Sequence, residues 1–193
     1  MANEYFILSN FGVRYFLKDY TDSDTVPSPA GPSDEITSVL SCDLGGFSKE
    51  VKKYRTLNSN GWESIAPLGQ SQDDATFELI REGEGDAYSS AGTTTYSKLK
   101  TWCLNNNAGG SASKKCIIEV VPRGMNGNTP VYEGTCYFVI PSQWKPGTKD
   151  VETGQEYSIT VSPFGPPIPV FVVFRRAARS TPESWAFTKL SST

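Results

Sequence analysis

The stretch from Thr56 to Gly83 constrains the fold more than any other part of the chain. It begins with the turn cluster Asn58–Gly61, because Asn and Gly adopt positive φ at little cost. Trp62 follows, and the next segment predicts a polar loop marked by Pro67, Gly69, Gln70 and Ser71. The stretch closes in Ala75–Arg81, where apolar and polar residues alternate. A period of two residues is typical of a half-buried β-strand.

Composition extends this β pattern to the whole chain. Its 193 residues include 17 Gly and 13 Pro, above the roughly 12 % that these two residues make up on average. Many such interruptions between short apolar runs favour an all-β architecture with long connections. The length fits one domain with its own core, spanning residues 1–193.

Charge and residue usage exclude several classes of function. The net charge of −3 and the pI near 5.1 argue against tight sequence-independent binding of nucleic acid, which needs an excess of Lys and Arg. The chain has no histidine, so a histidine base or histidine metal ligand is excluded. The cysteines lack CxxC spacing and sit in apolar contexts, which indicates buried thiols rather than a disulfide framework, at Cys42, Cys103, Cys116 and Cys136.

No targeting segment is visible. The N-terminus lacks the basic region of a signal peptide, and no apolar run approaches the length of a membrane span. We therefore expect a soluble protein made in a reducing cytoplasm, without contact to a membrane.

The N-terminal third predicts strands interrupted by a proline-rich segment. Glu4–Leu8 and Gly12–Lys18 are rich in aromatic and aliphatic residues and read as two short strands or one bent strand. Thr21–Glu35 contains three prolines and cannot pair inside a sheet. It is either a mobile linker or an arm that a neighbouring subunit orders. Ile36–Leu44 predicts another strand.

The segment Gly45–Leu57 is rich in charge, and we call it the ribbon. Its charges are Lys49, Glu50, Lys52, Lys53 and Arg55. A ribbon with more charge than apolar surface gains little by folding on itself. One interpretation is a solvated loop, and the other is a projecting hairpin that orders against another copy.

A single helix is expected over about Thr95–Asn105. Thr93–Thr95 offer an N-cap, and Tyr96, Leu99 and Cys103 form one apolar stripe with Trp102 beside it. We expect this stripe to pack on the sheet.

The remainder predicts a meander and a tail. The expected strands are Lys115–Val121, Val131–Ile140, Glu156–Ser162 and Val170–Phe174, with a turn at Arg123–Pro130. Val170–Phe174 is apolar throughout, which predicts cover on both faces. The tail, about residues 175–193, carries the basic residues Arg175, Arg176 and Arg179 and the apolar residues Trp185, Phe187 and Leu190. These apolar side chains either dock on their own domain or reach a neighbour.

Nothing in the sequence supports catalysis. Ser97–Lys100 matches the S-x-x-K pattern of penicillin-recognising enzymes, but the two partner motifs are missing. The acidic residues Asp73, Asp74, Glu82, Glu84 and Asp86 are expected to be solvated, and EF-hand spacing and a P-loop are absent. We expect no enzyme, no cofactor and no metal.

Several of these segments together resemble a known family. The turn and Trp at Asn58–Trp62, the strand Ala75–Arg81, the helix near Tyr96–Leu104 and the strands after it resemble the major tail tube proteins of long-tailed bacteriophages and related tail-like injection particles. The resemblance spans about residues 40–165. It implies a β-sandwich or barrel flanked by a single helix, with long extended loops and arms.

The resemblance also implies a function and its surfaces. Six subunits would join their sheets into a ring with a continuous inner β-barrel, and stacked rings would form the hollow conduit for DNA ejection into the host. The ribbon would bridge rings, and the full candidate set for contacts between subunits is Lys49, Lys52, Lys53, Tyr54, Arg55, Trp62, Arg175, Arg176, Trp185 and Phe187.

The implied partners are other copies of the chain and further tail proteins: the tail terminator, the tape measure and the baseplate or tail-tip proteins. DNA would pass through without being held. The N- and C-terminal segments are longer than those of short contractile-tail tube proteins, which leaves a contractile sheath open as a partner. The implied location is the virion tail, assembled in the bacterial cytoplasm.

A different class of function fits the same composition. A monomeric β-sandwich module that binds carbohydrate or a protein surface would use exposed tryptophans as its platform, here Trp62, Trp144 and Trp185. Concentration-dependent assembly distinguishes the two hypotheses.

Overall fold

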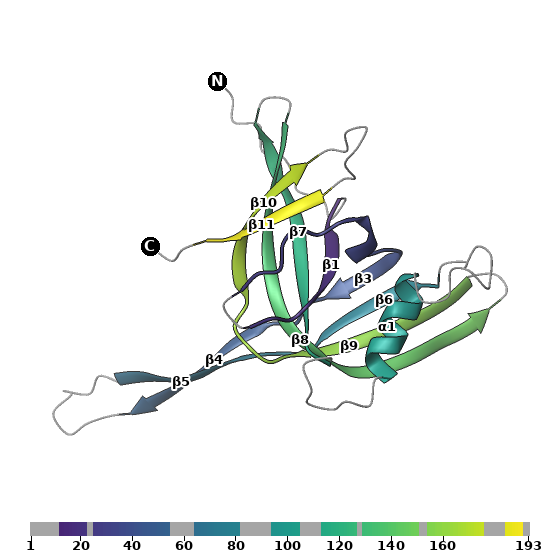
Figure 1. The fold of residues 1–193 in the computed structure, drawn as a ribbon. Helices are drawn as coiled ribbons and strands as arrows, with labels where there is room; N and C mark the ends of the chain where they lie inside the picture. Colours follow the sequence, from purple (N-terminus) through teal and green to yellow (C-terminus); the bar gives the residue numbers. More distant parts are fainter. Residues whose placement is uncertain are drawn as a thin grey trace, which may run out of the picture.

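The described residues of the chain fold into one long twisted sheet, a projecting hairpin and one α-helix (Figure 1). The computed structural model describes residues 12–22, 25–54, 64–81, 94–104, 113–126, 129–150, 154–175 and 184–190. The elements in these ranges are β1 (Arg14–Asp19), η1 (Pro32–Asp34), β2 (Glu35–Ile36), β3 (Val39–Asp43), β4 (Phe47–Tyr54), β5 (Ser64–Gln72), β6 (Ala75–Ile80), α1 (Thr95–Leu104), β7 (Lys115–Asn126), β8 (Thr129–Asp150), β9 (Gly154–Pro163), β10 (Ile168–Arg175) and β11 (Ser184–Lys189). The expected class, all-β with a single helix, is confirmed.

Strand β8 connects the two halves of the sheet. It is 22 residues long, and its first half pairs with β7 on one edge and β10 on the other, whereas its second half pairs with β9. The predicted end at Ile140 is wrong, because the strand continues through Pro141 and Pro146. The register with β9 shifts after each of these prolines, which is how a sheet accommodates a residue that lacks the donor.

The first half of the sheet curves around one core. The strands follow the order β2, β1, β7, β8, β10 and β11, and a bridge between Ala30 and Trp185 joins β11 to the segment before β2. The side chains enclosed in this way form the first core: Phe16, Ala30, Cys116, Ile118, Val120, Cys136, Phe138, Ile168, Val170, Val172, Trp185 and Phe187.

A second core lies on the other face of β7 and β8. It is closed by β9, β6, β3 and α1, and its buried members are Ile36, Ala75, Phe77, Leu79, Leu99, Trp102, Ile117, Val139, Tyr157, Ile159 and Val161. Alternation explains the nearly continuous apolar run in β7. Cys116, Ile118 and Val120 face the first core, whereas Ile117 faces the second.

Helix α1 packs on the second core as the apolar stripe predicts. The Thr94 hydroxyl accepts a hydrogen bond from the Ser97 N–H at 3.3 Å, which caps the first turn. Leu99 and Trp102 are buried, and the Trp102 indole N–H donates to the Ser113 carbonyl at 2.8 Å. The Tyr96 ring packs between β8 and β9, with its centroid 5.4 Å from Trp144 and 5.0 Å from Tyr157.

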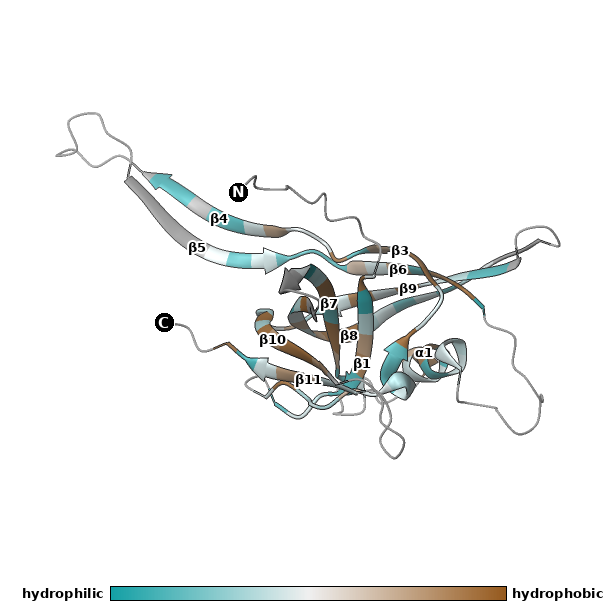
Figure 2. Ribbon diagram, turned by 90° about the horizontal axis from the view of Figure 1, so that it is seen from above, coloured by the Kyte–Doolittle hydropathy of each residue, from teal (hydrophilic) through white to brown (hydrophobic). Residues whose placement is uncertain are grey.

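Strands β4 and β5 form a separate two-stranded sheet that projects from the body (Figures 1 and 2). Of the two interpretations of the ribbon, the structure shows the projecting hairpin, whereas its ordering against another copy stays a prediction. Its partner is Ser64–Gln72, which the sequence predicts as a loop. That prediction is wrong because the pairing is supplied by the backbone of β4, which does not require an apolar period in β5.

Parts of the proline-rich segment and of the tail pack on their own domain, among them Ala30, Trp185 and Phe187. Neither alternative for Thr21–Glu35 holds for its described part: Ala30 is fully buried, and the Ser28 hydroxyl accepts a hydrogen bond from the Phe187 N–H at 3.0 Å. The Asp34 carboxylate accepts from the Gly31 N–H at 2.9 Å and ends the segment in a tight turn.

Other differences from the sequence prediction are local. Ile36–Leu44 is divided between β2 and β3, because Ser38 adopts a φ of 60° between them. Strand β7 continues through half of the predicted turn Arg123–Pro130, as far as Asn126, with a register shift after Pro122. Glu4–Leu8 and the acidic residues Glu82, Glu84 and Asp86 lie outside the described residues.

The prediction that β10 is covered on both faces is wrong for this chain. Val170 and Val172 point into the first core, but Phe171 is 52 % exposed and Val173 is 40 % exposed. The strand lies in a curved sheet with a single core-facing side, so every second apolar residue remains at the surface of the chain.

Candidate assembly surfaces

Two outer strands of the sheet carry open backbone edges. In the order β8, β9, β6, β3, each strand runs antiparallel to the next. Within the described ranges β3 pairs only with β6, and β8 from Ile140 to Asp150 pairs only with β9. Unpaired N–H and C=O groups along an edge are a template for another strand.

One face of these four strands is polar. Cross-strand register places Ser41, Glu78, Ser158 and Lys145 in one row and Asp43, Thr76, Thr160 and Gln143 in the next. Neighbours within the rows are hydrogen bonded, with 2.7 Å from the Ser41 hydroxyl to the Glu78 carboxylate and 3.3 Å between the Thr76 and Thr160 hydroxyls. The opposite face bears the alternate residues, such as Phe77 and Ile159, and packs on the second core.

The projecting hairpin is the second surface. Lys49, Lys52 and Lys53 are exposed, and Phe47 at its base is 58 % exposed. Besides the backbone ladder, its two strands are joined by a 2.6 Å hydrogen bond between the Ser48 and Ser71 hydroxyls. An isolated two-stranded ribbon is marginally stable in water, so this hairpin gains most when another surface packs on it.

The remaining predicted site residues are scattered. Tyr54 ends β4 and Arg175 ends β10, whereas Arg55, Trp62 and Arg176 lie outside the described residues. Trp185 and Phe187 are only 3 % and 5 % exposed. Trp185 and Phe187 therefore dock on their own domain, which is the first of the two alternatives for the tail.

The tryptophan platform of a binding module is not formed by the described residues. Trp185 is part of the first core. Trp144 is half-buried and packs against Tyr96 and Tyr157, with centroids 5.4 and 5.1 Å away. Amphipathic aromatics serve as ligand platforms when they are exposed, so this observation gives no support to that alternative.

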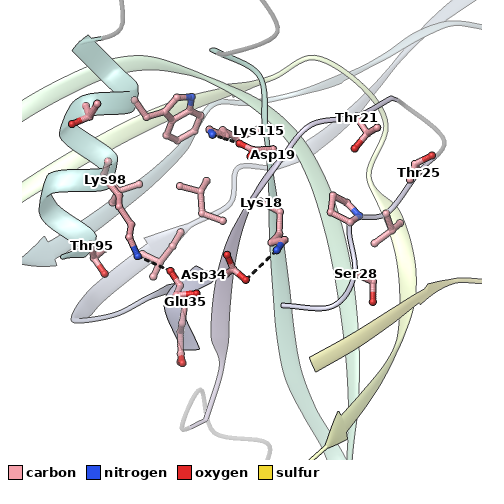
Figure 3. A pocket seen from close by; sticks show the side chains of 18 residues that line it. Lys18, Asp19, Thr21, Thr25, Ser28, Asp34, Glu35, Thr95, Lys98 and Lys115 are labelled. Atoms are coloured by element: carbon pink, nitrogen blue, oxygen red, sulfur yellow. Dashed lines mark hydrogen bonds and ion pairs between the residues drawn. The ribbon is translucent and has the colours of Figure 1, made fainter. Parts of the chain in front are cut away.

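A cavity of about 850 Å³ lies between β1, α1 and the proline-rich segment (Figure 3). Its charged side chains are already paired: Lys18 Nζ lies 3.0 Å from Asp34 Oδ2, Lys115 contacts Asp19, and Lys98 donates to the Ser33 carbonyl at 2.5 Å. These contacts tie the proline-rich segment and α1 to the sheet.

The described residues offer few groups for chemistry. They include no group of three or more acidic or thiol side chains that could hold a metal ion. They also include no helix of the length and apolarity that a membrane span requires. Lys100, the lysine of the S-x-x-K match, lies on the surface of α1 with its Nζ 5.7 Å from the centre of the Tyr96 ring.

One half-buried acid lies between β1, β7, β8 and β3. Glu119 of β7 accepts a hydrogen bond from the Tyr137 hydroxyl at 3.4 Å, and its register partner on β1 is Tyr15. Burial raises the pKa of Glu119 above its ordinary value, and the nearby Glu133 raises it further. Burial also raises the pKa of Tyr137 to about 12 and that of Cys42 to about 12.

Two surface positions escaped the sequence analysis. Asp43 and Lys145 occupy the two open edges of the same sheet, but in the sequence each is one charged residue among many. Their positions at the two edges follow from the register between strands, and a local sequence pattern does not contain the register of strands that are distant along the chain.

Comparison with solved structures gives the class of fold. No protein-family model matches the sequence, and no curated protein matches it. A chain of the sheath–tube complex of an extracellular contractile injection system, PVC, in the extended state aligns with a TM-score of 0.59 and 13 % identity, covering 88 % of this chain and 95 % of that chain. The structure of the PVC sheath/tube terminator aligns with a TM-score of 0.55 and 14 % identity over 87 % and 99 %.

A third structure, the tube-terminating cap of the anti-feeding prophage, aligns with a TM-score of 0.53 and 13 % identity over 84 % and 90 % of the two chains. The chain therefore has the fold found in the tube assemblies of tail-like injection particles. The resemblance to tail tube proteins is confirmed at the level of the fold.

Proposed function

We propose that this protein is a tail tube subunit, a structural protein that assembles into stacked hexameric rings around a hollow channel. The observation that carries the proposal is the pair of open edges on the sheet β8–β9–β6–β3. The fold shared with tube assemblies supports it. The number of subunits is taken from the resemblance to tail tube proteins.

The strand directions favour closure into a ring. Because the four strands alternate, the outer strands β3 and β8 run in opposite directions. A second copy placed alongside by rotation therefore brings its β3 antiparallel to β8 of the first copy, and the sheet continues without a break. Head-to-tail contacts that close give rings, and closing a sheet removes its edges.

The polar face of the sheet supports a channel lining. Half of the side chains in its two rows carry hydroxyl groups, and the two carboxylates Asp43 and Glu78 outnumber the one cation, Lys145. Binding of DNA to a protein draws its affinity from cations that replace counterions. A lining in which hydroxyls and carboxylates outnumber the cation would let DNA pass during ejection without retaining it.

The projecting hairpin supports stacking of one ring on the next. The hairpin of β4 and β5 reaches beyond the other strands and away from the body (Figure 2). Its exposed cations Lys49, Lys52 and Lys53 would meet the adjacent ring of a subunit whose net charge is −3. The tail terminator, tape measure and baseplate or tail-tip proteins are the further partners that a tail tube would have in a virion tail, and a contractile sheath is an additional candidate.

Assembly of the isolated chain tests this function. We expect the purified protein to form annuli or hollow tubes of uniform diameter as its concentration rises, seen by negative-stain electron microscopy and sedimentation velocity. Cysteine replacements at Ser41 and Gln143, which lie on the two edge strands, should be joined between copies by a short bis-maleimide cross-linker only in the assembled state. A protein that stays monomeric and uncross-linked at every concentration contradicts the proposal.

A further inference from the structure

We propose that Lys145 of one copy pairs with the acidic residues Asp43 and Glu78 of the next copy, and that this contact fixes the register and polarity of the ring. The inference rests on the proposed ring assembly. Lys145 lies on the open part of β8, Asp43 lies on the open strand β3, and Glu78 lies one strand further in on β6.

The register of the sheet brings these groups to one face. Lys145 is opposite Ser158, Ser158 is opposite Glu78, and Glu78 is opposite Ser41. Continuing the same row into a neighbouring copy places Ser41 of that copy opposite Lys145. Asp43 is two residues further along β3 and therefore points to the same face as Ser41.

Distances within a sheet allow the contact. Neighbouring strands lie about 4.8 Å apart, and diagonal residues lie about 7–8 Å apart. The long Lys145 side chain can therefore reach Asp43 diagonally across the junction. It can also approach Glu78, whose carboxylate is turned toward the β3 edge by the hydrogen bond from Ser41.

The three side chains are available for such a contact. All are exposed, and no ion pair of any of them occurs among the described residues. Asp43 Oδ1 accepts from the Gly45 N–H at 3.0 Å, and Glu78 Oε2 accepts from the Ser41 hydroxyl at 2.7 Å. Each carboxylate thus has its second oxygen for Lys145.

The arrangement also opposes a competing assembly. Two copies related by a two-fold axis would pair β8 with β8 or β3 with β3. With the axis at the level of Lys145, the first pairing places Lys145 beside a second Lys145. With the axis at the level of Asp43, the second brings together two copies of Asp43, near the exposed Asp73 and Asp74. Like charges directly opposite on paired strands are destabilising, and such repulsion selects against wrong partners. The head-to-tail junction, in the register of the sheet, instead joins Lys145 to carboxylates.

Charge exchange tests the contact. We expect Lys145→Glu and Asp43→Lys each to raise the concentration needed for half-assembly by at least about tenfold at low salt. The double variant Lys145→Glu/Asp43→Lys should recover a large part of the lost assembly, and the unchanged Glu78, now near a carboxylate at position 145, should keep the recovery incomplete. Asp43→Asn keeps an acceptor for Gly45 and removes only the charge, so it should give a smaller shift. Lys100→Glu on α1 is the matched control and should assemble as the native protein does.

The outcomes separate this inference from the proposed function. If the native protein forms rings and both single variants assemble just as well, the contact is overturned but the tube function remains. The same holds if the double variant fails to recover while circular dichroism shows that all variants are folded. Absence of rings from the native protein at every concentration overturns the function and the contact together.

Discussion

Ala30 and Trp185 exchange two backbone hydrogen bonds, with 2.9 Å from the Ala30 N–H to the Trp185 carbonyl and 2.8 Å in the reverse direction. This bridge joins the proline-rich segment to the last strand and closes the strands around the first core. The Trp185 ring fills that core against Phe174, Tyr132 and Phe16, with centroids 4.5, 4.9 and 5.7 Å away.

Truncation of this ring tests its structural role. We expect Trp185→Ala to lower the free energy of unfolding by about 3–5 kcal/mol, the usual range when a large buried aromatic is removed. Urea unfolding followed by circular dichroism measures the change. Trp185→Phe retains most of the contacts and should cost clearly less. A loss below about 1 kcal/mol for the alanine variant is incompatible with a core position.

Stability should depend on pH through Glu119. Its pKa in the folded protein lies above the ordinary value of 4.5, so the folded state binds this proton more tightly than the unfolded state does. The contribution of this protonation to the free energy of unfolding is fully present below pH 4.5 and is lost as the pH rises through the raised pKa of Glu119. Glu119→Gln, which retains an acceptor for Tyr137, should therefore raise the melting temperature at neutral pH and not at pH 4. Equal melting shifts at both pH values would show that the charge of Glu119 has no part in the effect.

Reversing the charge of the hairpin should separate folding from stacking. We expect Lys52→Glu/Lys53→Glu to leave the melting temperature of the subunit unchanged, because both side chains are exposed. Tube length in electron micrographs should fall by about tenfold or more, since like charges across an interface are repulsive.

The control for the hairpin changes the net charge equally at other sites. Arg123 is also exposed, and its 3.9 Å contact with Glu133 joins two exposed side chains, so it contributes little to stability. Lys100→Glu/Arg123→Glu should form tubes of native length. Tubes of native length from the hairpin variant would remove these lysines from the stacking surface.

The thiols should be unreactive until the chain unfolds. Cys116 and Cys136 are fully buried, and burial raises the pKa of Cys103 to about 11 and that of Cys42 to about 12. The thiolate is the reactive form, so labelling with a disulfide reagent at pH 8 should be at least about 100-fold slower than for an unperturbed thiol. Denaturant should release all four thiols. A rapidly labelled cysteine in the folded protein would contradict this environment.

The sequence predicted those elements whose evidence is local. The alternation in Ala75–Arg81 predicted β6, and the spacing of Tyr96, Leu99 and Cys103 predicted α1. These patterns succeed because the period of the side chains directly reports which face of an element is buried. The resemblance to tail tube proteins gathered such local features and led to the correct fold.

Long-range pairing was beyond the reach of these patterns. Strand β5 is polar and contains Pro67, and β8 continues past Pro141 and Pro146, so composition alone predicted a loop in one case and a strand end in the other. Pairing with β4 and with β9 supplies the backbone hydrogen bonds that make these segments strands. Register, which no local pattern contains, also places Lys145 and Asp43 on one face at opposite edges of the sheet.

By itself, the sequence determined the class of fold, the position of the helix and the absence of histidine chemistry, because residue type and local period suffice for these. The tertiary structure decided where the proline-rich segment docks, which aromatics of the tail are buried and which strands have open edges. Each of these depends on residues that are far apart in the chain and meet only when the sheet curves and closes around its two cores.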